Sequence, residues 1–252
     1  MVKTLNFALL GACILATGWC APAGVGPDAL GPNGGITGTK GLSDTANITY
    51  CGDAGAATIL TGGDPEEGPG FWITNNDDDP KVRYFLYENS RDDHAWKYLM
   101  IPQGGRAFVK VCDTWQGHVV RGTEAVNFKR EVHNLGTWFV SNVDENGIMW
   151  GDVSFLQGCD GGGSVKATDG SGVSRVCLQD MLAGAPAEAL ATKATGTQAL
   201  ARIVGDGANQ AARAWGMSKC SPNEVWLDNL NSNSVISSAN GRLEWVAYKG
   251  RA

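Results

Sequence analysis

The sequence has few charged residues, and few positive ones in particular, which excludes several classes of protein. Only 18% of its 252 residues are charged, and 26 Asp and Glu outnumber 20 Lys and Arg, for a formal net charge of −6 at pH 7. Nucleic-acid binding normally depends on clustered cations that neutralise phosphates, so we exclude a nucleic-acid partner. Beyond the first 20 residues there is also no apolar run of about 18 residues, so we expect no membrane insertion.

Patterns that mark metal and hydrolase sites are missing as well. His94, His118 and His133 show no metal-ligand spacing, and no CxxC pair is present. The acidic run 77–79 lacks the alternating ligands and final Glu of a calcium loop, so we interpret it as a hairpin tip. No Ser or Cys lies in a recognisable nucleophile turn. We therefore expect no bound metal and no cofactor.

Glycine is abundant, with 35 residues, and this argues against a helical bundle because glycine weakens helices and favours turns. Short runs with strand-like alternation follow one another, each bounded by Gly, Asn, Asp or Pro. Their spacing predicts a mainly β protein, an antiparallel β-sandwich. The expected strands are 71–75, 83–88, 98–101, 107–112, 118–123, 136–143, 148–156, 224–227, 235–238 and 242–248, with short additions at 45–51 and 57–60.

Composition divides the chain into three parts. Residues 1–18 hold Lys3, an apolar run and then small residues, which is the pattern of an export signal and predicts a secreted protein. Residues 19–70 form a Gly- and Pro-rich N-terminal segment, expected to be a solvated lead-in. Residues 71–252 form the sandwich domain, with an Ala-rich insertion at 179–216 that predicts one or two amphipathic helices packed on the sandwich.

Seven cysteines in an exported chain predict disulfides. Signal cleavage after Gly18 leaves six cysteines, whereas cleavage after Ala23 leaves five, and parity favours the earlier site. Cys177 is a plausible partner for Cys159 across a glycine-rich corner, although sequence does not determine the pairing. The disulfide candidates are Cys20, Cys51, Cys112, Cys159, Cys177 and Cys220. Asn47 begins an Asn-Ile-Thr sequon and is the predicted glycosylation site.

Three segments resemble a known family in their order and spacing. Residues 71–76 read as a strand that ends in two asparagines, residues 117–123 place an Arg near a Thr after a Gly, and residues 152–158 read Asp-Val-Ser-Phe-Leu-Gln-Gly. Over residues 71–165 the chain resembles the thaumatin-like proteins, which are secreted β-sandwiches with a helical, disulfide-rich second domain. The resemblance implies a divergent, fungal secreted member. Some family members use an acidic cleft to hydrolyse β-1,3-glucans.

The family's cleft residues carry over incompletely. Arg121 lies one position before the family's Arg, and residues 138–140, which include no acid, occupy the place of its Glu. Asp152 matches one family Asp, Gln157 replaces the next, and Asp160 stands where the family often has Asn. Glycoside hydrolysis normally needs two carboxyls about 5–10 Å apart, so the inherited pair is lost. Asp152 and Asp160 remain as the catalytic candidates.

Tryptophan is the other signal, because an indole can stack on a sugar ring or fill a sandwich core. Of the 9 tryptophans, we expect Trp115, at a predicted hairpin tip, to be the most exposed. The ligand-binding candidates are Arg121, Trp115, Trp138, Asp152 and Asp160. Arg121 as an ion-pair anchor and Asp152 as an acceptor of backbone hydrogen bonds are the structural alternatives.

These observations predict a protein of a cell wall or host surface that binds a polysaccharide or a cell-surface protein without turning it over. One alternative is a glycoside hydrolase of the β-1,3-glucanase type whose carboxyls have moved to Asp152, Asp160, Glu124 or Glu131. The other is a virulence-type secreted effector with no glycan ligand, which would expose an apolar or aromatic patch elsewhere.

Overall fold

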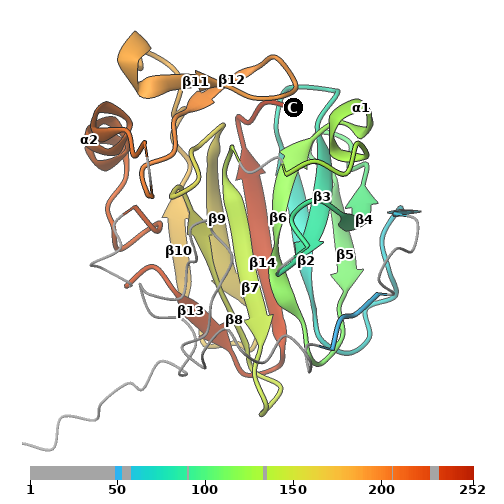
Figure 1. Ribbon diagram of the computed structural model, residues 1–252. Helices are drawn as coiled ribbons and strands as arrows, with labels where there is room; N and C mark the ends of the chain where they lie inside the picture. Colours follow the sequence, from blue (N-terminus) through green and yellow to red (C-terminus); the bar gives the residue numbers. More distant parts are fainter. Residues whose placement is uncertain (1–48, 53–57, 90, 133–134, 206, 228–232) are drawn as a thin grey trace, which may run out of the picture.

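The computed structural model describes residues 49–52, 58–89, 91–132, 135–205, 207–227 and 233–252. Two β-sheets pack face to face, and most neighbouring strands are antiparallel, so the predicted sandwich is confirmed (Figure 1). The larger sheet contains, in spatial order, β1 (Ile59–Thr61), β4 (Ala95–Leu99), β3 (Arg83–Glu88), β6 (Gln116–Gly122), β7 (Trp138–Val143), β8 (Met149–Ser154) and β13 (Ile236–Ser238). The smaller sheet contains β10 (Ser174–Cys177), β9 (Gly162–Ala167), β14 (Arg242–Tyr248), β2 (Gly70–Asn76) and β5 (Arg106–Lys110).

Strand alternation builds the core between the sheets. Phe71 on β2 and Trp245 on β14 face inward, with ring centroids 4.3 Å apart, and Trp245 also contacts Phe139 of the opposing sheet. These three side chains are fully buried, and large aromatic surfaces removed from water are a major source of sandwich stability. β14 pairs in parallel with β2 and antiparallel with β9, so the C-terminal strand lies in the middle of the smaller sheet.

A second apolar cluster lies on the outer face of the larger sheet. It consists of Phe85, Tyr87, Ala95, Tyr98, Val120, Trp138 and Val140. The short helix α1 (Glu124–Asn127) leads into Phe128, whose ring packs edge-on against Phe85 at 5.6 Å and Tyr98 at 5.0 Å. The segment between β6 and β7 therefore covers one end of this face.

The Ala-rich segment is less helical than its composition predicts. Its α-helix is α2 (Gln210–Lys219), where the Asn209 side chain caps the helix by accepting a hydrogen bond from the Ala212 N–H. Before it come a 3-10 turn at Ala187–Ala189 and a hairpin of β11 (Leu190–Thr192) and β12 (Gln198–Leu200). Gly184 and Gly196 adopt left-handed φ angles of 77° and 86°, which end any helix there. The hairpin and α2 cover one end of the sandwich (Figure 1).

Strand predictions also differ from the structure elsewhere. The strand predicted at 98–101 is observed as β4, over Ala95–Leu99. β9 and β10 were not expected, because their glycine-rich approach reads as a corner rather than a strand. Residues 224–227, predicted to be a strand, instead make an isolated bridge between Trp226 and Ser154. The N-terminal segment is tied to the sandwich, since β1 pairs in parallel with β4.

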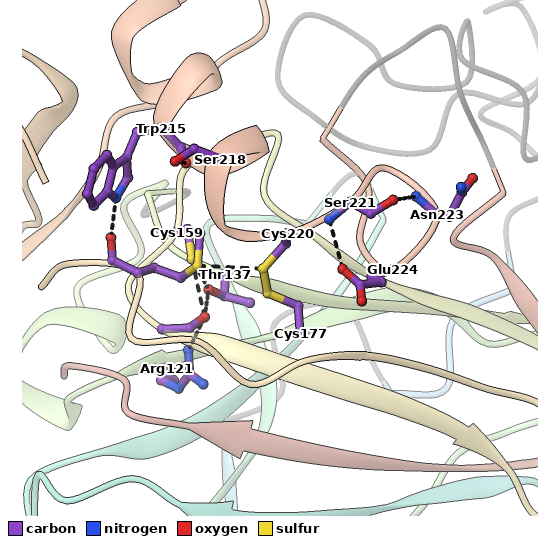
Figure 2. The surroundings of a disulfide bond; sticks show 12 residues. Arg121, Thr137, Cys159, Cys177, Trp215, Ser218, Cys220, Ser221, Asn223 and Glu224 are labelled. Carbon is purple, nitrogen blue, oxygen red and sulfur yellow. Dashed lines mark hydrogen bonds between the residues drawn. A yellow bond between two sulfur atoms is a disulfide. The ribbon is translucent and has the colours of Figure 1, made fainter.

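Two disulfides join distant parts of the described chain. Cys51 bonds to Cys112 just after β5, and Cys177 of β10 bonds to Cys220 at the end of α2 (Figure 2). The predicted disulfide of Cys159 is wrong: this thiol is free and buried, and its Sγ lies 3.3 Å from the Thr137 hydroxyl and 3.2 Å from the Gly161 carbonyl. Cys177, which pairs with Gly163 of β9 at the end of β10, bonds to Cys220 instead.

Several predictions fall on residues outside the described ranges. The export signal at 1–18, Cys20 and the sequon at Asn47 all lie there. Among the helices of the described chain, none is both long enough and apolar enough to cross a bilayer. The two disulfides fit a protein that matures in an oxidising compartment.

Candidate functional site

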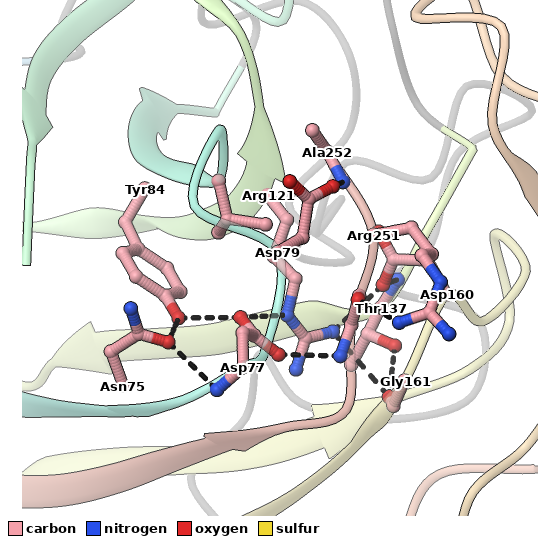
Figure 3. A network of polar contacts seen from close by, with 12 residues as sticks. Asn75, Asp77, Asp79, Tyr84, Arg121, Thr137, Asp160, Gly161, Arg251 and Ala252 are labelled. Atoms are coloured by element: carbon pink, nitrogen blue, oxygen red, sulfur yellow. Dashed lines mark hydrogen bonds and ion pairs between the residues drawn. The ribbon is translucent and has the colours of Figure 1, made fainter. Parts of the chain in front are cut away.

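Arg121 and Asp160 meet in a buried ion cluster (Figure 3). The Arg121 guanidinium pairs with Asp77 at 3.0 Å and with Asp160 at 2.7 Å, and it also donates to the Gly162 carbonyl. Lys193 reaches the second oxygen of Asp160 at 2.6 Å. The four charged side chains are at most 6% exposed, so two cations and two anions balance inside the protein.

The cluster also binds the C-terminal residues of the chain. The Gly250 N–H donates to Asp77, and Lys193 donates to the Arg251 carbonyl at 3.0 Å. Burial alone would raise the pKa of Asp160, but Lys193 and Arg121 outweigh it and hold this pKa below its ordinary value. Asp160 therefore stays ionised, with both oxygens occupied. These contacts anchor strands and leave neither Arg121 nor Asp160 open to a ligand.

Asp152 lies away from this cluster, on the outer face of the larger sheet. Four residues on neighbouring strands form one row across this face. In order they are Asp152 of β8, Val140 of β7, His118 of β6 and Tyr87 of β3. Because alternate residues of a strand point to opposite faces, Arg121 belongs to the inner face while His118 belongs to the outer one. Arg121, Asp152 and Asp160 consequently do not converge in one groove.

The row around Asp152 is buried, and its His118 and Asp152 side chains are both uncharged in mildly acidic solution. His118 stacks on Trp138 with ring centroids 3.7 Å apart and planes 3° apart, and Tyr87 stacks on its other side at 5.5 Å. Burial lowers the pKa of His118 to about 3 and raises the pKa of Asp152 to about 7. Asp152 is 3% exposed, and no described residue donates a hydrogen bond to its Oδ2.

The next row along the same face reaches solvent. Gln116, Asn142 and Trp150 are in register on β6, β7 and β8; Gln116 is exposed and the other two are half-buried. We call these three residues the amide–indole row. The Trp150 Nε1–H donates to Asp144 at 3.0 Å, which fixes the indole. Although burial acts to raise the Asp144 pKa, hydrogen bonds from Trp150 and the turn backbone hold it below its ordinary value, so Asp144 is ionised.

The two tryptophans selected from the sequence are both buried. The expected exposure of Trp115 is wrong: its ring is fully buried against Phe71 and Trp96, and its Nε1–H donates to Ser141 at 2.9 Å. Trp138 is 3% exposed and forms part of the His118 stack. Sequence reasoning missed Trp150. The available signal was alternation along β8, which places Trp150 on the same outward face as Asp152 and next to the predicted turn.

The acidic run 77–79 borders a separate cavity of about 410 Å³, which Met100 and Gln103 also line. Asp77 belongs to the ion cluster. Asp78 pairs with Arg251 at 3.1 Å, and Asp79 accepts hydrogen bonds from the backbone N–H groups of Lys81 and Ala252. All three carboxylates therefore have partners within the chain.

Comparison with known proteins assigns no family. No family model matches the chain, and no curated protein matches it. Among solved structures the chain is similar to a laminaripentaose-producing β-1,3-glucanase in complex with laminaritetraose, at 14% sequence identity and a TM-score of 0.34. The match covers 52% of this chain and 52% of the enzyme, so it spans about half of that enzyme's length. A likeness of this size assigns no function.

Proposed function

We propose that this protein is a secreted binder of a neutral polysaccharide at a cell wall or host surface, and that the amide–indole row holds the ligand. The observation that carries the proposal is a half-exposed indole aligned with two amides across three adjacent strands. An indole face packs on the C–H face of a sugar, while Gln and Asn side chains donate to and accept from hydroxyls.

The dimensions and charge of the row favour a linear, uncharged chain. Neighbouring strands are about 4.8 Å apart, so the row from Gln116 to Trp150 is roughly 10 Å long. The hydrogen bond to Asp144 prevents the indole from rotating freely. Ionised Asp144 and the net charge of −6 would repel an anionic polysaccharide.

Binding without turnover fits the state of the nearby carboxyls. Hydrolysis of a glycosidic bond normally uses two carboxyls placed about 5–10 Å apart across that bond. Asp152 is almost completely buried, and Asp144 accepts hydrogen bonds from Trp150 and from the N–H groups of Asn146 and Ile148. Asp152 is therefore inaccessible to a ligand on the row, and both oxygens of Asp144 already accept hydrogen bonds from the protein.

The test compares Trp150→Ala with the wild type in pull-downs on insoluble β-1,3-glucan, chitin and cellulose. Trp215→Ala is the matched control, because Trp215 is also half-buried but lies on α2 and donates to the Met181 carbonyl. We expect the wild type and Trp215→Ala to bind one of these polymers, and Trp150→Ala to bind it roughly tenfold more weakly. Equal retention of Trp150→Ala, or no binding of the wild type to any polymer, would contradict the proposal.

One observation favours a second candidate, a glycoside hydrolase. Burial raises the pKa of Asp152 on β8 to about 7, a value suited to a general acid, and Asp144, in the turn between β7 and β8, is held ionised. In that case the protein would release reducing ends from β-1,3-glucan, and Asp152→Asn and Asp144→Asn would each abolish the release. A binder releases none, and its affinity should survive Asp152→Asn.

A further inference from the structure

We propose that reduction of the Cys51–Cys112 disulfide creates a binding site for Zn²⁺, in which Glu88 is the third protein ligand. The Sγ atoms of Cys51 and Cys112 and a carboxylate oxygen of Glu88 all lie within 4.8 Å of one another. Two thiolates, one carboxylate and a water would complete the four-coordinate geometry that zinc prefers. The amide–indole row takes no part in this site.

Glu88 is held in position for such a role by the chain itself. Its Oε1 accepts a hydrogen bond from the Cys51 N–H at 2.6 Å, which keeps the carboxylate beside the sulfurs. Its Oε2 is buried and accepts no hydrogen bond from any described residue, although the Arg91 guanidinium lies 3.6 Å away. Glu88 is only 3% exposed, and a buried carboxylate oxygen without a hydrogen bond is costly unless a cation binds it.

The charges and the backbone geometry also suit a divalent ion. Two thiolates and a carboxylate around Zn²⁺ leave one net negative charge, which Arg91 offsets. The Cα atoms of Cys51 and Cys112 are 5.3 Å apart, and tetrahedral bonds of about 2.3 Å place two sulfurs roughly 3.8 Å apart. Side-chain rotation alone can produce that separation. Both cysteines are half-buried, so an ion and a water can reach them.

The chemistry balances with an external dithiol as the reductant. The dithiol supplies two electrons and two protons, becomes a cyclic disulfide, and leaves Cys51 and Cys112 as thiols. Zn²⁺ then displaces both thiol protons into solvent while the Glu88 carboxylate binds as an anion. The ion would replace the covalent tie between the N-terminal segment and the end of β5. No sequence motif reveals this site, because Cys51 lies 37 residues from Glu88 and 61 from Cys112.

The experiment uses the full chain with Cys13→Ser and Cys20→Ser in every sample. After reduction with dithiothreitol and removal of the reductant without air, Co²⁺ is titrated in and Zn²⁺ then displaces it. Thiolate-to-Co²⁺ charge-transfer absorption reports ligation by sulfur. We expect one ion per reduced chain, no uptake by the oxidised chain, and loss of the absorption in Cys51→Ser/Cys112→Ser.

Glu88→Gln isolates the third ligand, and Glu244→Gln is its control, because Glu244 pairs with Arg106 on the other sheet. We expect at least a roughly tenfold loss of zinc affinity for Glu88→Gln and none for Glu244→Gln. Unchanged affinity in Glu88→Gln, or absorption of undiminished intensity in Cys51→Ser/Cys112→Ser, overturns the proposal. If the reduced chain unfolds, Zn²⁺ should restore its circular dichroism and melting transition; failure to restore them also overturns it.

Discussion

Replacing Asp152 with Asn should stabilise the protein near and above pH 7. Burial raises the pKa of this carboxyl from 3.8 to about 7, so the folded chain holds a proton that the unfolded chain has already released. The stability contributed by the protonated group is complete below pH 3.8 and is lost as the pH rises to about 7. The pKa values of Asp152 in the folded and unfolded chains differ by about three units, which corresponds to about 4 kcal/mol in the free energy of unfolding. Asp152→Asn would not lose this free energy as the pH rises, because an amide does not ionise.

His118 should produce the opposite slope. Burial lowers its pKa from 6.5 to about 3, so its stabilising contribution is complete above pH 6.5 and is lost as the pH falls toward 3. Between pH 4 and 6.5 the two slopes nearly cancel in the wild type. Each group changes the free energy of unfolding by about 3 kcal/mol over that interval, at 1.36 kcal/mol per pH unit.

The assay is urea unfolding at five pH values from 4 to 8, for the wild type, Asp152→Asn and His118→Phe, which keeps an aromatic ring in the stack. Relative to the wild type, Asp152→Asn should lose stability as the pH falls from 6.5 to 4, and His118→Phe should gain it. Each variant is compared with the wild type at the same pH, so the contributions of other titrating groups to the free energy of unfolding cancel. Asp92, whose pKa is raised to about 6 by burial, is one such group. Parallel curves for all three proteins would refute the assignment of a buried neutral carboxyl and a buried neutral imidazole to this row.

Three further measurements address other parts of the molecule. Asp160→Asn leaves the charges of Arg121 and Lys193 undercompensated, so it should lower the free energy of unfolding in urea by about 3–5 kcal/mol. Asp78→Asn removes an exposed ion pair and should lower it by less than about 1 kcal/mol. Equal losses would contradict a buried cluster. Cys159 is buried, and burial raises its pKa to about 12, so iodoacetamide should modify it only at urea concentrations that unfold the chain; rapid labelling of the native protein would disprove this. Truncation of the fully buried Trp115 to Ala should cost about 3–5 kcal/mol, and a change near zero would show that the indole is not in the core.

The sandwich was predictable because its strands are marked by local signals. Alternating apolar residues and Gly or Asn turns predict β2, β3 and β5 through β8 in nearly their observed ranges, whereas β4 begins three residues before its predicted start. Pairing is a different matter, since β14 joins β2 across most of the chain and no local pattern encodes that contact. The same limit applies to the disulfides, where Cys177 pairs with Cys220, just after α2, rather than with Cys159.

The site was only partly predictable, for a related reason. Asp152 is a catalytic and ligand-binding candidate from the sequence, but its burial depends on what covers the strand, which the sequence pattern does not reveal. His118 and Arg121 are three positions apart on one strand, so their side chains point to opposite faces of the sheet. Since Asp152 lies in the same row as His118, Arg121 and Asp152 cannot line one groove. Trp115 illustrates the converse error, because a residue beside a turn can still point into the core when the following strand continues its inward face.

The central position of β14 also has a kinetic consequence. Arg242 pairs with Gly70, so the smaller sheet closes only when segments more than 170 residues apart meet, which is a slow search. Until then β2–β5 and β9–β10 each present an unpaired strand edge, with a gap one strand wide between them. A β14 from a second molecule has the same sequence and fits the same gap, so strand exchange between copies competes with closure whenever folding occurs at high concentration.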